Sequence, residues 1–419
     1  MSIIHDILPV EEDCYTLSAS TLKKVQREIF LIGSGQTKFG EWWEKSLRNL
    51  AEEAVEKAIG DAGCKPTDID AVIVANMLAE TSNNQAHLGA MVSSLLPHRP
   101  PALRVEAACA SGSVAVHTAC ALLESGRAQT ILVLGLEKMT DVTGETIASA
   151  LMGAADSEHD QPSGLTFPGI FGLIAQRYMH EHGLTREDLN LVSALHHRHA
   201  GKNPNAHFRN AIEPDEVTKS PLVADPLHVL DCSPISDGAA ACILSSLKGS
   251  QHHQCIRLAA SQIAHDTLSI TERESITSFS ATKKASQNAY TEAGITKEDI
   301  SCIEHHDCFS IAAIINLEDL GFAEKGKGIE WYKDNIIRSG KTPVMSTAEP
   351  WLSAAGQGHN INPSGGLKAC GHPVGATGVK QIIEIGKKLE ENNAKWGLAH
   401  NFGGACATCC VTILENTSA

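Results

Sequence analysis

The sequence lacks any long hydrophobic run and lacks an excess of positive charge. No apolar stretch approaches the roughly 18 residues that a membrane-spanning helix needs, so membrane insertion is not expected. Lys and Arg number 34 against 49 Asp and Glu, a net charge of −15, which argues against general attraction to nucleic acid or anionic lipid. Of the 419 residues, 42% are hydrophobic and 20% are charged, which predicts a globular protein. An anionic substrate would need a local basic pocket.

The chain also lacks the marks of a secreted or imported protein. Residues 1–16 contain several acidic residues and no arginine, and residues 415–419 form no peroxisomal address, so a cytoplasmic location is expected. Thirteen cysteines without a signal peptide fit a reducing compartment, in which most are buried thiols. Cys406, Cys409 and Cys410 have no second pair at zinc-like spacing, which favours structural thiols over a metal site.

A repeated unit is the main feature of the chain. In residues 47–62 apolar residues recur three and four positions apart, which predicts a helix, and residues 68–77 contain an apolar run typical of a strand covered on both faces. The pattern returns 231 positions later with six identical residues, which suggests duplication. Ala54, Ala58, Ala62, Gly63, Asp68 and Ile69 match Ala285, Ala289, Ala293, Gly294, Asp299 and Ile300.

Each copy continues with further strands and helices, which predicts two α/β halves with mostly parallel sheets. The first half has a strand ending near Ala108, a helix over 111–124 and a strand over 130–136; the second has a Gly-rich turn, a helix over 374–391 and a strand over 396–401. Residues 111–123 carry no formal charge, so that helix is expected to be buried on all sides, between two sheets.

The predicted boundaries follow from this pattern. Residues 1–27 form an N-terminal extension, 28–250 the first half and 251–419 the second half. Residues 138–230 interrupt the alternation of strands and helices and are expected to form an inserted lid or loop domain within the first half. In that insertion His196, His197 and His199 are expected on a helix, where a solvated or substrate-lining role is favoured over a metal site.

Cys109 is the first candidate for chemistry, because it lies where a strand gives way to a helix opening at Ser111. A helix N-terminus stabilises a thiolate and lowers the pKa of the thiol. A second candidate is His306-Asp307-Cys308-Phe309, which follows the repeat-unit strand, at the end where α/β folds place their sites. A buried core thiol and a chance polar strand end remain the alternative readings.

Two glycine-rich segments complete the set. Residues 362–366 and 371–378 contain neither the dinucleotide nor the nucleoside-triphosphate spacing, so their glycines indicate close backbone approach and His372 is the residue of interest. Asn401-Phe402-Gly403-Gly404 follows another strand, and its glycine amides could face a developing oxyanion.

These motifs together resemble the thiolase family, and in particular its sterol carrier protein-type branch. The resemblance extends over residues 28–415 and rests on Cys109 before Ala110-Ser111-Gly112, the HDCF motif 306–309 and the GHP motif 371–373. It implies an α/β thiolase fold, five layers ordered αβαβα from two similar halves, and a homodimer or homotetramer. It also implies CoA and acyl-CoA as substrates, no cofactor or metal, and a place in lipid and fatty acid metabolism.

By this resemblance each motif has a role. Cys109 is the nucleophile that carries the acyl group, and His372 helps to generate its thiolate. His306 and His372 bind the enolate oxygen, while the backbone amides of Cys109 and Gly403 bind the oxygen of the acyl intermediate. Most thiolases have their second catalytic cysteine in a Cys-x-Gly motif, where this chain has Asn401-Phe402-Gly403, so the acid/base role passes to Cys308.

Several alternatives stay open. Cys370 lies directly before the GHP motif and is a rival acid/base. A decarboxylating 3-ketoacyl synthase also uses one cysteine and two histidines, although it needs no base at the donor carbon, and a non-catalytic acyl-CoA-binding relative is a third reading. The sequence sets neither the acyl-chain preference nor the direction of the reaction.

Overall fold

The computed structural model describes residues 27–247, 256–337 and 359–419, so the extension predicted over 1–27 lies almost entirely outside it. Its strands form a sheet in which the two halves of the chain repeat one order, β3-β2-β4-β7-β1 and β10-β9-β11-β12-β8. The first set is β1 Phe30–Gln36, β2 Ala71–Ala75, β3 Ala102–Val105, β4 Thr130–Glu137 and β7 Gly238–Ser245. The second is β8 Ile256–His265, β9 Ile300–Glu304, β10 Asn360–Ile361, β11 Trp396–Gly403 and β12 Thr408–Asn416.

The strand directions repeat as well. β2 is parallel to β3 and β4, as β9 is to β10 and β11, and the remaining pairs within each half are antiparallel. One residue pair, Phe30 with Arg257, joins β1 to β8 and so links the two five-stranded halves. The predicted duplication is confirmed, because β2 and β9 hold equivalent positions in halves of the same topology.

The helices that precede β2 and β9 end in the same way. α1 (Leu47–Ala62) stops at Gly63 with φ 61°, and α9 (Ser280–Ala293) stops at Gly294 with φ 69°. Both glycines adopt the left-handed conformation that ends helices and that other residues disfavour. A short 3₁₀ turn then leads into the strand in both copies, at Pro66–Asp68 and Lys297–Asp299. The identical glycines of the repeat therefore have the same structural function.

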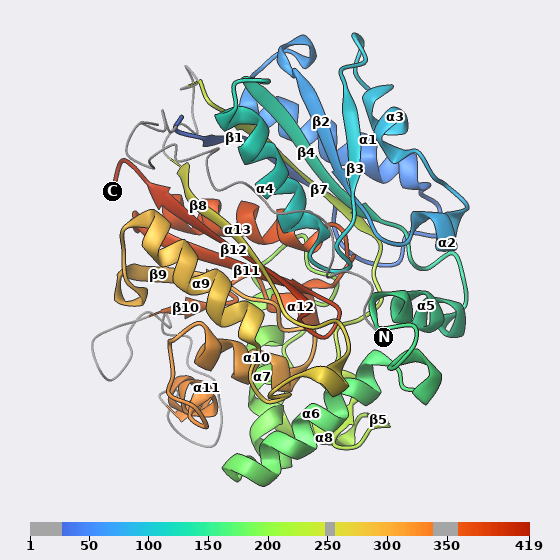
Figure 1. Ribbon diagram of the computed structural model, residues 1–419, viewed down its shortest axis with the longest axis vertical. Helices are drawn as coiled ribbons and strands as arrows, with labels where there is room; N and C mark the ends of the chain where they lie inside the picture. Colours follow the sequence, from blue (N-terminus) through green and yellow to red (C-terminus); the bar gives the residue numbers. More distant parts are fainter. Residues whose placement is uncertain (1–26, 248–255, 338–358) are drawn as a thin grey trace, which may run out of the picture.

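The helices make the layers around the sheet visible in Figure 1. α4 (Ser111–Glu124) and α13 (Thr377–Glu391) lie between the halves and pack on strands of both, while α1 and α9 cover the outer faces. α3 (Leu88–Ser93) joins α1 on its face, and α10 (Ser310–Asp319) contacts α9. This arrangement agrees with the predicted αβαβα layering.

Glycines let the two central helices cross closely. A Cβ on Gly378 would lie 2.3 Å from the backbone N of Ser113, and a Cβ on Gly112 would lie 2.8 Å from the backbone N of Gly378. Neither position has room for a side chain. The glycines of segment 371–378 thus serve close backbone approach, as the sequence predicted.

The prediction that the uncharged helix 111–123 is buried on all sides is wrong for one stripe. α4 buries eight of its residues, but Val114, His117, Thr118 and Leu122 are only partly buried and Ala121 is exposed. The helix contacts the sheets and α13 on its other faces. Within one chain, the described residues leave this stripe partly uncovered.

The segment between β4 and β7 is largely helical rather than a loop. It contains α5 (Gly144–Leu151), α6 (Phe167–His182), α7 (Arg186–Ala200), α8 (Pro214–Lys219) and the short pair β5 (Leu222–Ala224) and β6 (Leu227–His228). α7 packs on α10, on α11 (Gly328–Ile337) and on α12 (Gly366–Cys370) of the second half. The remaining helix, α2 (Ala79–Asn83), follows β2.

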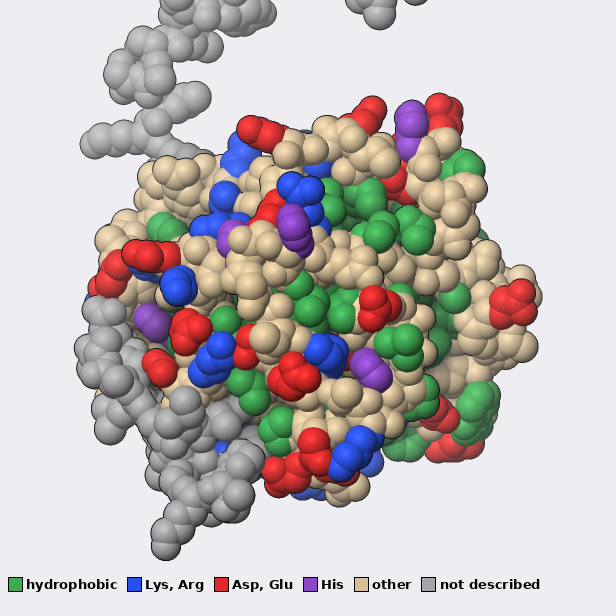
Figure 2. All heavy atoms as spheres, turned by 90° about the horizontal axis from the view of Figure 1, so that it is seen from below, with side chains coloured by type: hydrophobic (Ala, Val, Ile, Leu, Met, Phe, Trp, Pro, Cys, Tyr) green, Lys and Arg blue, Asp and Glu red, His purple; other side chains and the backbone are tan. Residues whose placement is uncertain are grey.

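Figure 2 views the end of the molecule that carries α6, α8 and β5, where hydrophobic side chains form several groups between charged ones. Exposed hydrophobic residues of the inserted segment include Leu173, Leu222, Val223 and Val229. None of the helices in the described ranges is both long and apolar enough to cross a bilayer.

Candidate active site

Four of the predicted site residues meet at one cavity of about 360 Å³. Cys109, His306, Cys308 and His372 all line it. Cys109 follows β3, and His306 and Cys308 follow β9, so the site forms at the carboxyl ends of parallel strands as expected. The rest of the wall is mostly hydrophobic and comes largely from the inserted segment, with Ile147, Leu151, Phe167, Phe171, Val223 and Val229 among its residues.

A tight turn presents the Cys109 thiol to this cavity. Ala108 has φ 51°, a left-handed conformation that costs a residue with a Cβ about 1 kcal/mol. The Ser111 hydroxyl holds the turn, since it donates to the Ala108 carbonyl (2.6 Å) and accepts from the Ala107 N–H (2.9 Å). The backbone N of Ala110 also donates to the Ala107 carbonyl at 3.0 Å. The chain therefore turns sharply at Cys109, between the end of β3 and the start of α4.

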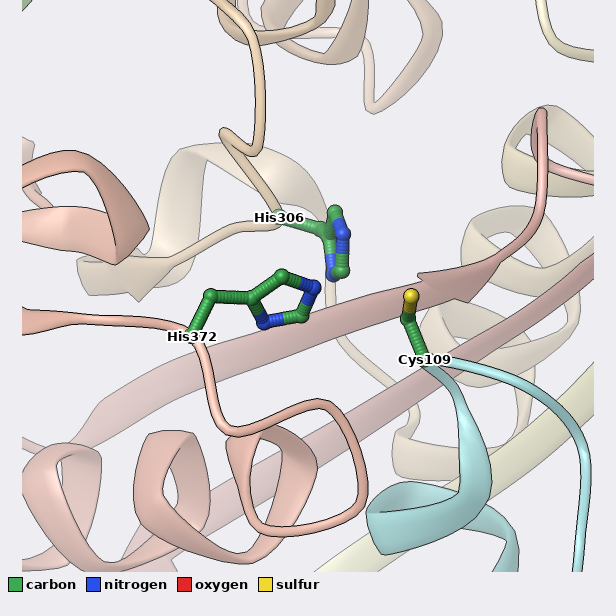
Figure 3. A group of neighbouring side chains, drawn as sticks. All are labelled: Cys109, His306 and His372. Carbon is green, nitrogen blue, oxygen red and sulfur yellow. The ribbon is translucent and has the colours of Figure 1, made fainter. Parts of the chain in front are cut away.

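Two imidazole rings face the sulfur of Cys109. One ligand atom from each of Cys109, His306 and His372 lies within 4.8 Å of the others. Figure 3 shows the sulfur and both rings directed into one space from three separate segments. The ring centroids of the histidines are 5.0 Å apart and the rings are nearly perpendicular. Within the described chain, the Nε2 atoms of both rings are buried and have no hydrogen-bond partner.

Hydrogen bonds on the far side of each ring define which nitrogen carries the hydrogen. The Thr377 hydroxyl donates to the Pro373 carbonyl at 3.1 Å, so it accepts from Nδ1 of His372, 2.6 Å away. Nε2 of neutral His372 then has a free lone pair facing the cavity. The Asn401 side-chain amide instead donates to Nδ1 of His306 at 2.9 Å. Nε2 of His306 therefore carries the hydrogen and presents a donor.

Burial keeps both histidines neutral. Desolvation lowers the pKa of His372 to about 3. Desolvation also lowers the pKa of His306 well below its usual value, and the neighbouring His372 ring lowers it further. His372 can therefore accept a proton at neutral pH, while His306 can donate a hydrogen bond. The two rings have opposite tasks.

The free Cys109 thiol differs from the sequence expectation. Burial raises its pKa to about 12, and the N–H of Gly404, which faces the sulfur, only partly opposes this. The expected lowering by the helix N-terminus is outweighed, because the surrounding protein desolvates the thiolate. A base such as His372 is therefore needed to take the proton as the sulfur attacks.

The glycine next to the sulfur is also one residue away from the predicted one. Gly404 lines the cavity, whereas Gly403 lies at the end of β11. A Cβ on Gly403 would come within 2.4 Å of the Ala107 carbonyl, so Gly403 brings β11 close to the turn that carries Cys109. The backbone N–H of this segment that faces the Cys109 sulfur is therefore that of Gly404.

The structure separates the two candidates for the second cysteine. Cys308 lines the cavity, and burial together with the nearby Cys109 raises its pKa well above the usual value. Cys370 is fully buried in α12 outside the set of cavity-lining residues, and the Asn203 side-chain amide lies 3.7 Å from its sulfur. Of these two cysteines, Cys308 is the one that lines the cavity with Cys109.

The other candidate clusters do not assemble as metal sites. Over the described ranges, the only group of three or more His, Cys, Asp or Glu side chains close enough to share a metal ion is Cys109 with His306 and His372. Thiol and imidazole are zinc ligands, but the hydrogen on Nε2 of His306 suits an oxyanion donor better. His196 and His197 are buried and His199 is half-buried on α7, as expected of a helix, and His197 lines the cavity.

Sequence reasoning gave no role to two residues of this site, Thr377 and Lys368, and named Gly404 only as one of two glycines whose amides could face an oxyanion. Lys368 lines the cavity although it is 1% exposed. Thr377 lies five residues after His372, a spacing at which a turn brings side chains together, so it could have been suspected. Nothing in the sequence shows that Lys368 is buried, because lysine is almost always at the surface.

Comparison with known proteins assigns the family. A model of the thiolase N-terminal domain matches residues 29–248, and one of a thiolase C-terminal domain-like unit matches residues 262–349. The chain belongs to the thiolase family. It is 41% identical to an acetyl-CoA acetyltransferase of Methanothermobacter thermautotrophicus, over 93% of this chain and 100% of that protein. It is 32% identical to human sterol carrier protein 2, over 90% of this chain and 70% of that protein.

Solved thiolase structures share the fold. Human mitochondrial 3-ketoacyl-CoA thiolase, solved in complex with CoA, matches with a TM-score of 0.72 at 18% identity, over 94% of this chain and 98% of that one. These findings confirm the predicted family, fold class and enzyme class. The chain is a thiolase-family acyltransferase.

Proposed function

We propose that this thiolase moves acyl groups between CoA and Cys109, either cleaving 3-ketoacyl-CoA with CoA or condensing two acetyl-CoA into acetoacetyl-CoA. The observation that carries the proposal is the arrangement of Cys109, His306 and His372 within 4.8 Å, with one ring ready to accept a proton and the other ready to donate a hydrogen bond. The names of the similar acetyl-CoA acetyltransferases support the same reaction.

In the direction of cleavage, Nε2 of His372 takes the proton of Cys109 as the sulfur attacks the 3-keto carbon. The bond between C2 and C3 breaks, and its electrons form the enolate of acetyl-CoA. The enolate oxygen accepts hydrogen bonds from Nε2 of His306 and from His372, which is now protonated. Cys308 gives its proton to C2, and the acyl group remains on Cys109.

The second half of the reaction restores the enzyme. The Cys308 thiolate takes the proton of an incoming CoA thiol, and the CoA sulfur attacks the acyl carbon on Cys109. The amides of Cys109 and Gly404 stabilise the oxygen of that intermediate. As Cys109 leaves, His372 returns its proton to the sulfur. No cofactor or metal takes part in this scheme.

The experiment is intact and peptide mass spectrometry after incubation with acetyl-CoA, together with thiolysis assays over 3-ketoacyl-CoA chain lengths. We expect one acetyl group on Cys109 and none in Cys109→Ala, with thiolysis lost in that variant. An acyl-enzyme in Cys109→Ala would contradict the assignment. CoA binding without any acylation would favour a binding protein, and turnover of malonyl-CoA in place of acetyl-CoA a decarboxylating synthase.

We also propose a homodimer. The support is the partly uncovered, uncharged stripe of α4 and the outermost position of β3 in the sheet, where Leu103 is half exposed. A partly uncovered, uncharged helix face and an open strand edge are typical of surfaces that a second copy covers. Light scattering after size exclusion tests this, and a monomer at all concentrations would contradict it. The cytoplasmic location and the link to lipid metabolism stay predictions from the sequence.

A further inference from the structure

Lys368 is a buried cation in the wall of the catalytic cavity. It lies in α12, two residues after Gly366, and only 1% of its surface is exposed. It lines the same cavity as Cys109 and Cys308. Burying an ammonium group without a compensating charge costs roughly several kcal/mol. The groups that stabilise the buried charge of Lys368 therefore need to be identified. The scheme proposed above gives it no role.

The ammonium group makes few hydrogen bonds to the protein. Its Nζ donates to the backbone carbonyl of Asp307 at 2.6 Å, and Oδ2 of the same residue is 4.0 Å away. Lysine has three N–H donors. Among the residues that the structure describes, no second acceptor lies within hydrogen-bond distance of Nζ. Part of its donor capacity therefore has no partner among the described residues, and the side chain lines the cavity.

The Asp307 carboxylate is shared among several partners. Oδ1 accepts from the Leu367 N–H at 2.7 Å, and Nδ1 of His196 lies 2.7 Å from Oδ2. Burial alone would raise the pKa of Asp307, yet His196 and then Lys368 hold it well below the usual value. Gly366 makes room for this carboxylate, because a Cβ there would meet Oδ2 at 2.3 Å. Asp307 thus anchors α12 to the HDCF motif instead of forming a close ion pair with Lys368.

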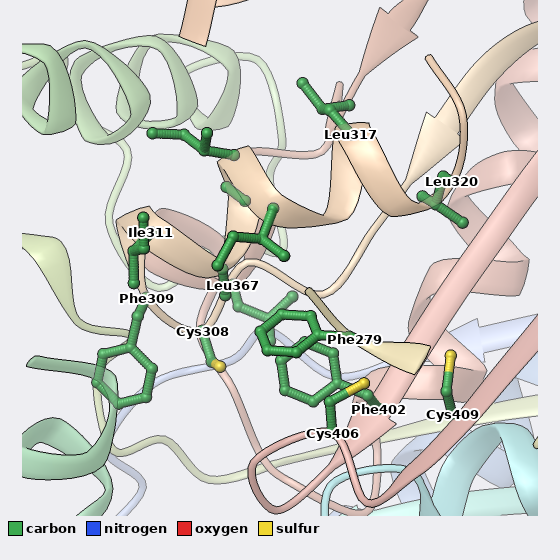
Figure 4. Packing of buried hydrophobic residues seen from close by; sticks show 14 of the residues in the cluster. Phe279, Cys308, Phe309, Ile311, Leu317, Leu320, Leu367, Phe402, Cys406 and Cys409 are labelled. Atoms are coloured by element: carbon green, nitrogen blue, oxygen red, sulfur yellow. The ribbon is translucent and has the colours of Figure 1, made fainter. Parts of the chain in front are cut away.

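The backbone around Cys308 is fixed from two sides. Lys368 holds the carbonyl of Asp307, and the Ser233 N–H donates to the carbonyl of Cys308 at 2.8 Å. Figure 4 shows the sulfur of Cys308 well apart from those of Cys406 and Cys409. The Cys308 and Lys368 side chains line the same cavity, and the ammonium group holds the carbonyl of the residue directly before Cys308.

We propose that Lys368 is a positioning residue for the acid/base step: its ammonium group is the charge partner of the Cys308 thiolate. It stabilises that thiolate after Cys308 has given its proton to C2, or before Cys308 takes a proton from acetyl-CoA. The inference rests on the proposed function. Burial raises the pKa of Cys308, and the nearby Cys109 raises it further. The charge of Lys368 lowers this pKa more than any other group does, which agrees with the proposed role.

The sharpest variant is Lys368→Gln. A glutamine amide can still donate to the Asp307 carbonyl, but it carries no charge. We expect acetylation of Cys109 to stay within about threefold of wild type, because His372 activates the nucleophile and the departing CoA thiolate is a good leaving group that solvent can protonate without Cys308. Exchange of deuterium into the acetyl group of acetyl-CoA should fall about a hundredfold, in the range typical of lost acid/base catalysis. Its pH profile should move to higher pH, and Lys368→Arg should recover most of the loss.

A second measurement keeps the test decisive if Lys368→Gln is unstable. The pH dependence of Cys308 alkylation, read by peptide mass spectrometry at low temperature, should shift upward in the glutamine variant. Lys380→Gln is the matched control, because Lys380 is equally buried but pairs with Glu304 at 2.9 Å outside the set of cavity-lining residues. It should lower stability without moving the exchange profile.

The outcomes separate the two proposals. Equal losses of acetylation and exchange in Lys368→Gln, or an unmoved pH profile, would show that Lys368 only supports the fold and would overturn this inference. Failure of the wild-type protein to acetylate Cys109 would instead overturn the proposed function itself.

Discussion

His306 and His372 have different roles because of the residues behind them. The Thr377 hydroxyl is committed as a donor to the Pro373 carbonyl, and the Asn401 amide donates to His306. Each contact fixes one tautomer, so the two rings present a lone pair and an N–H to the same space. The sequence contains both histidines but does not show this division, since it depends on neighbours from other segments.

The role of Thr377 can be tested directly. In Thr377→Val the acceptor for the Nδ1 hydrogen of His372 is lost, so the ring is free to take the other tautomer and its lone pair turns away from Cys109. We expect acetylation of Cys109 to slow about tenfold to a hundredfold, as typical for partners behind a functional ring. Stopped-flow or quench measurements of acetylation check this. Thr377→Ser keeps the hydroxyl and should remain near wild type; equal losses in both variants would point to packing.

A second test at the residue scale distinguishes the two cysteines. Cys308→Ala should still acetylate Cys109, because the CoA thiolate is a good leaving group that solvent can protonate. It should lose deuterium exchange into acetyl-CoA and acetoacetyl-CoA thiolysis, by about 10² to 10⁴. Cys370→Ala should be milder, because Cys370 does not line the cavity. Thermal melting of both variants controls for folding. Loss of exchange in Cys370→Ala alone would transfer the acid/base role to that residue.

At the scale of elements, the crossing of α4 and α13 is the contact that joins the two catalytic segments. Cys109 precedes α4, and His372 precedes α13. The helices approach through Gly112 and Gly378, where a Cβ would lie under 3.0 Å from backbone atoms. Backbone cannot move aside as a flexible side chain can, so any larger residue here separates the helices.

Gly378→Ala should therefore lower the free energy of unfolding by about 1–3 kcal/mol, the usual cost of overpacking. Gly60, in the exposed part of α1, is the matched control because no atom lies within 4 Å of a Cβ built there. Gly60→Ala should raise stability by about 0.5–1 kcal/mol. Urea unfolding of both variants gives the comparison. A neutral Gly378→Ala would show that the crossing is looser than the distances indicate.

The sequence predicted the elements better than their environment. The limits of α1 follow from periodicity and from the glycine stop at Gly63, which are local properties. The partly uncovered stripe of α4 was not predicted, because the absence of charge shows that a face avoids water but not what covers it. The resemblance gave the oxyanion role to Gly403, whereas Gly404 faces the sulfur, and Lys368 was not predicted; both depend on the distance between segments far apart in the chain.

At the scale of the whole molecule, buried neutral histidines make stability depend on pH. His305, His306, His372 and His400 are nearly inaccessible, and desolvation lowers the pKa of each, to about 3 for His372 and His400. An unfolded histidine binds a proton below about pH 6.5. Between pH 6.5 and about 3 the unfolded chain thus holds more protons on these residues, so their contribution to stability is lost as pH falls.

Glu137 acts in the opposite direction. Burial raises its pKa to about 8, so below that pH the folded state holds a proton that the unfolded chain releases above about pH 4.5. One carboxyl group cannot offset four histidines. Between pH 6.5 and 5 these five groups together take up two to three protons on unfolding, a contribution of about 3–4 kcal/mol per pH unit. Cooperative acid unfolding should therefore begin well above the pKa of ordinary carboxyl groups.

Urea unfolding at several pH values between 7.5 and 5 measures this slope. His400→Gln is the informative variant, because His400 is buried and lies outside the cavity lining. Its slope should be smaller by about one proton, or 1.4 kcal/mol per pH unit. Any constant destabilisation from the substitution shifts the whole curve without changing its slope, so packing damage and proton linkage are separated. Stability that stays flat from pH 6.5 to 5 would mean that these histidines are charged or hydrated in the folded enzyme, and the neutral pair of rings at Cys109 would have to be reconsidered with them.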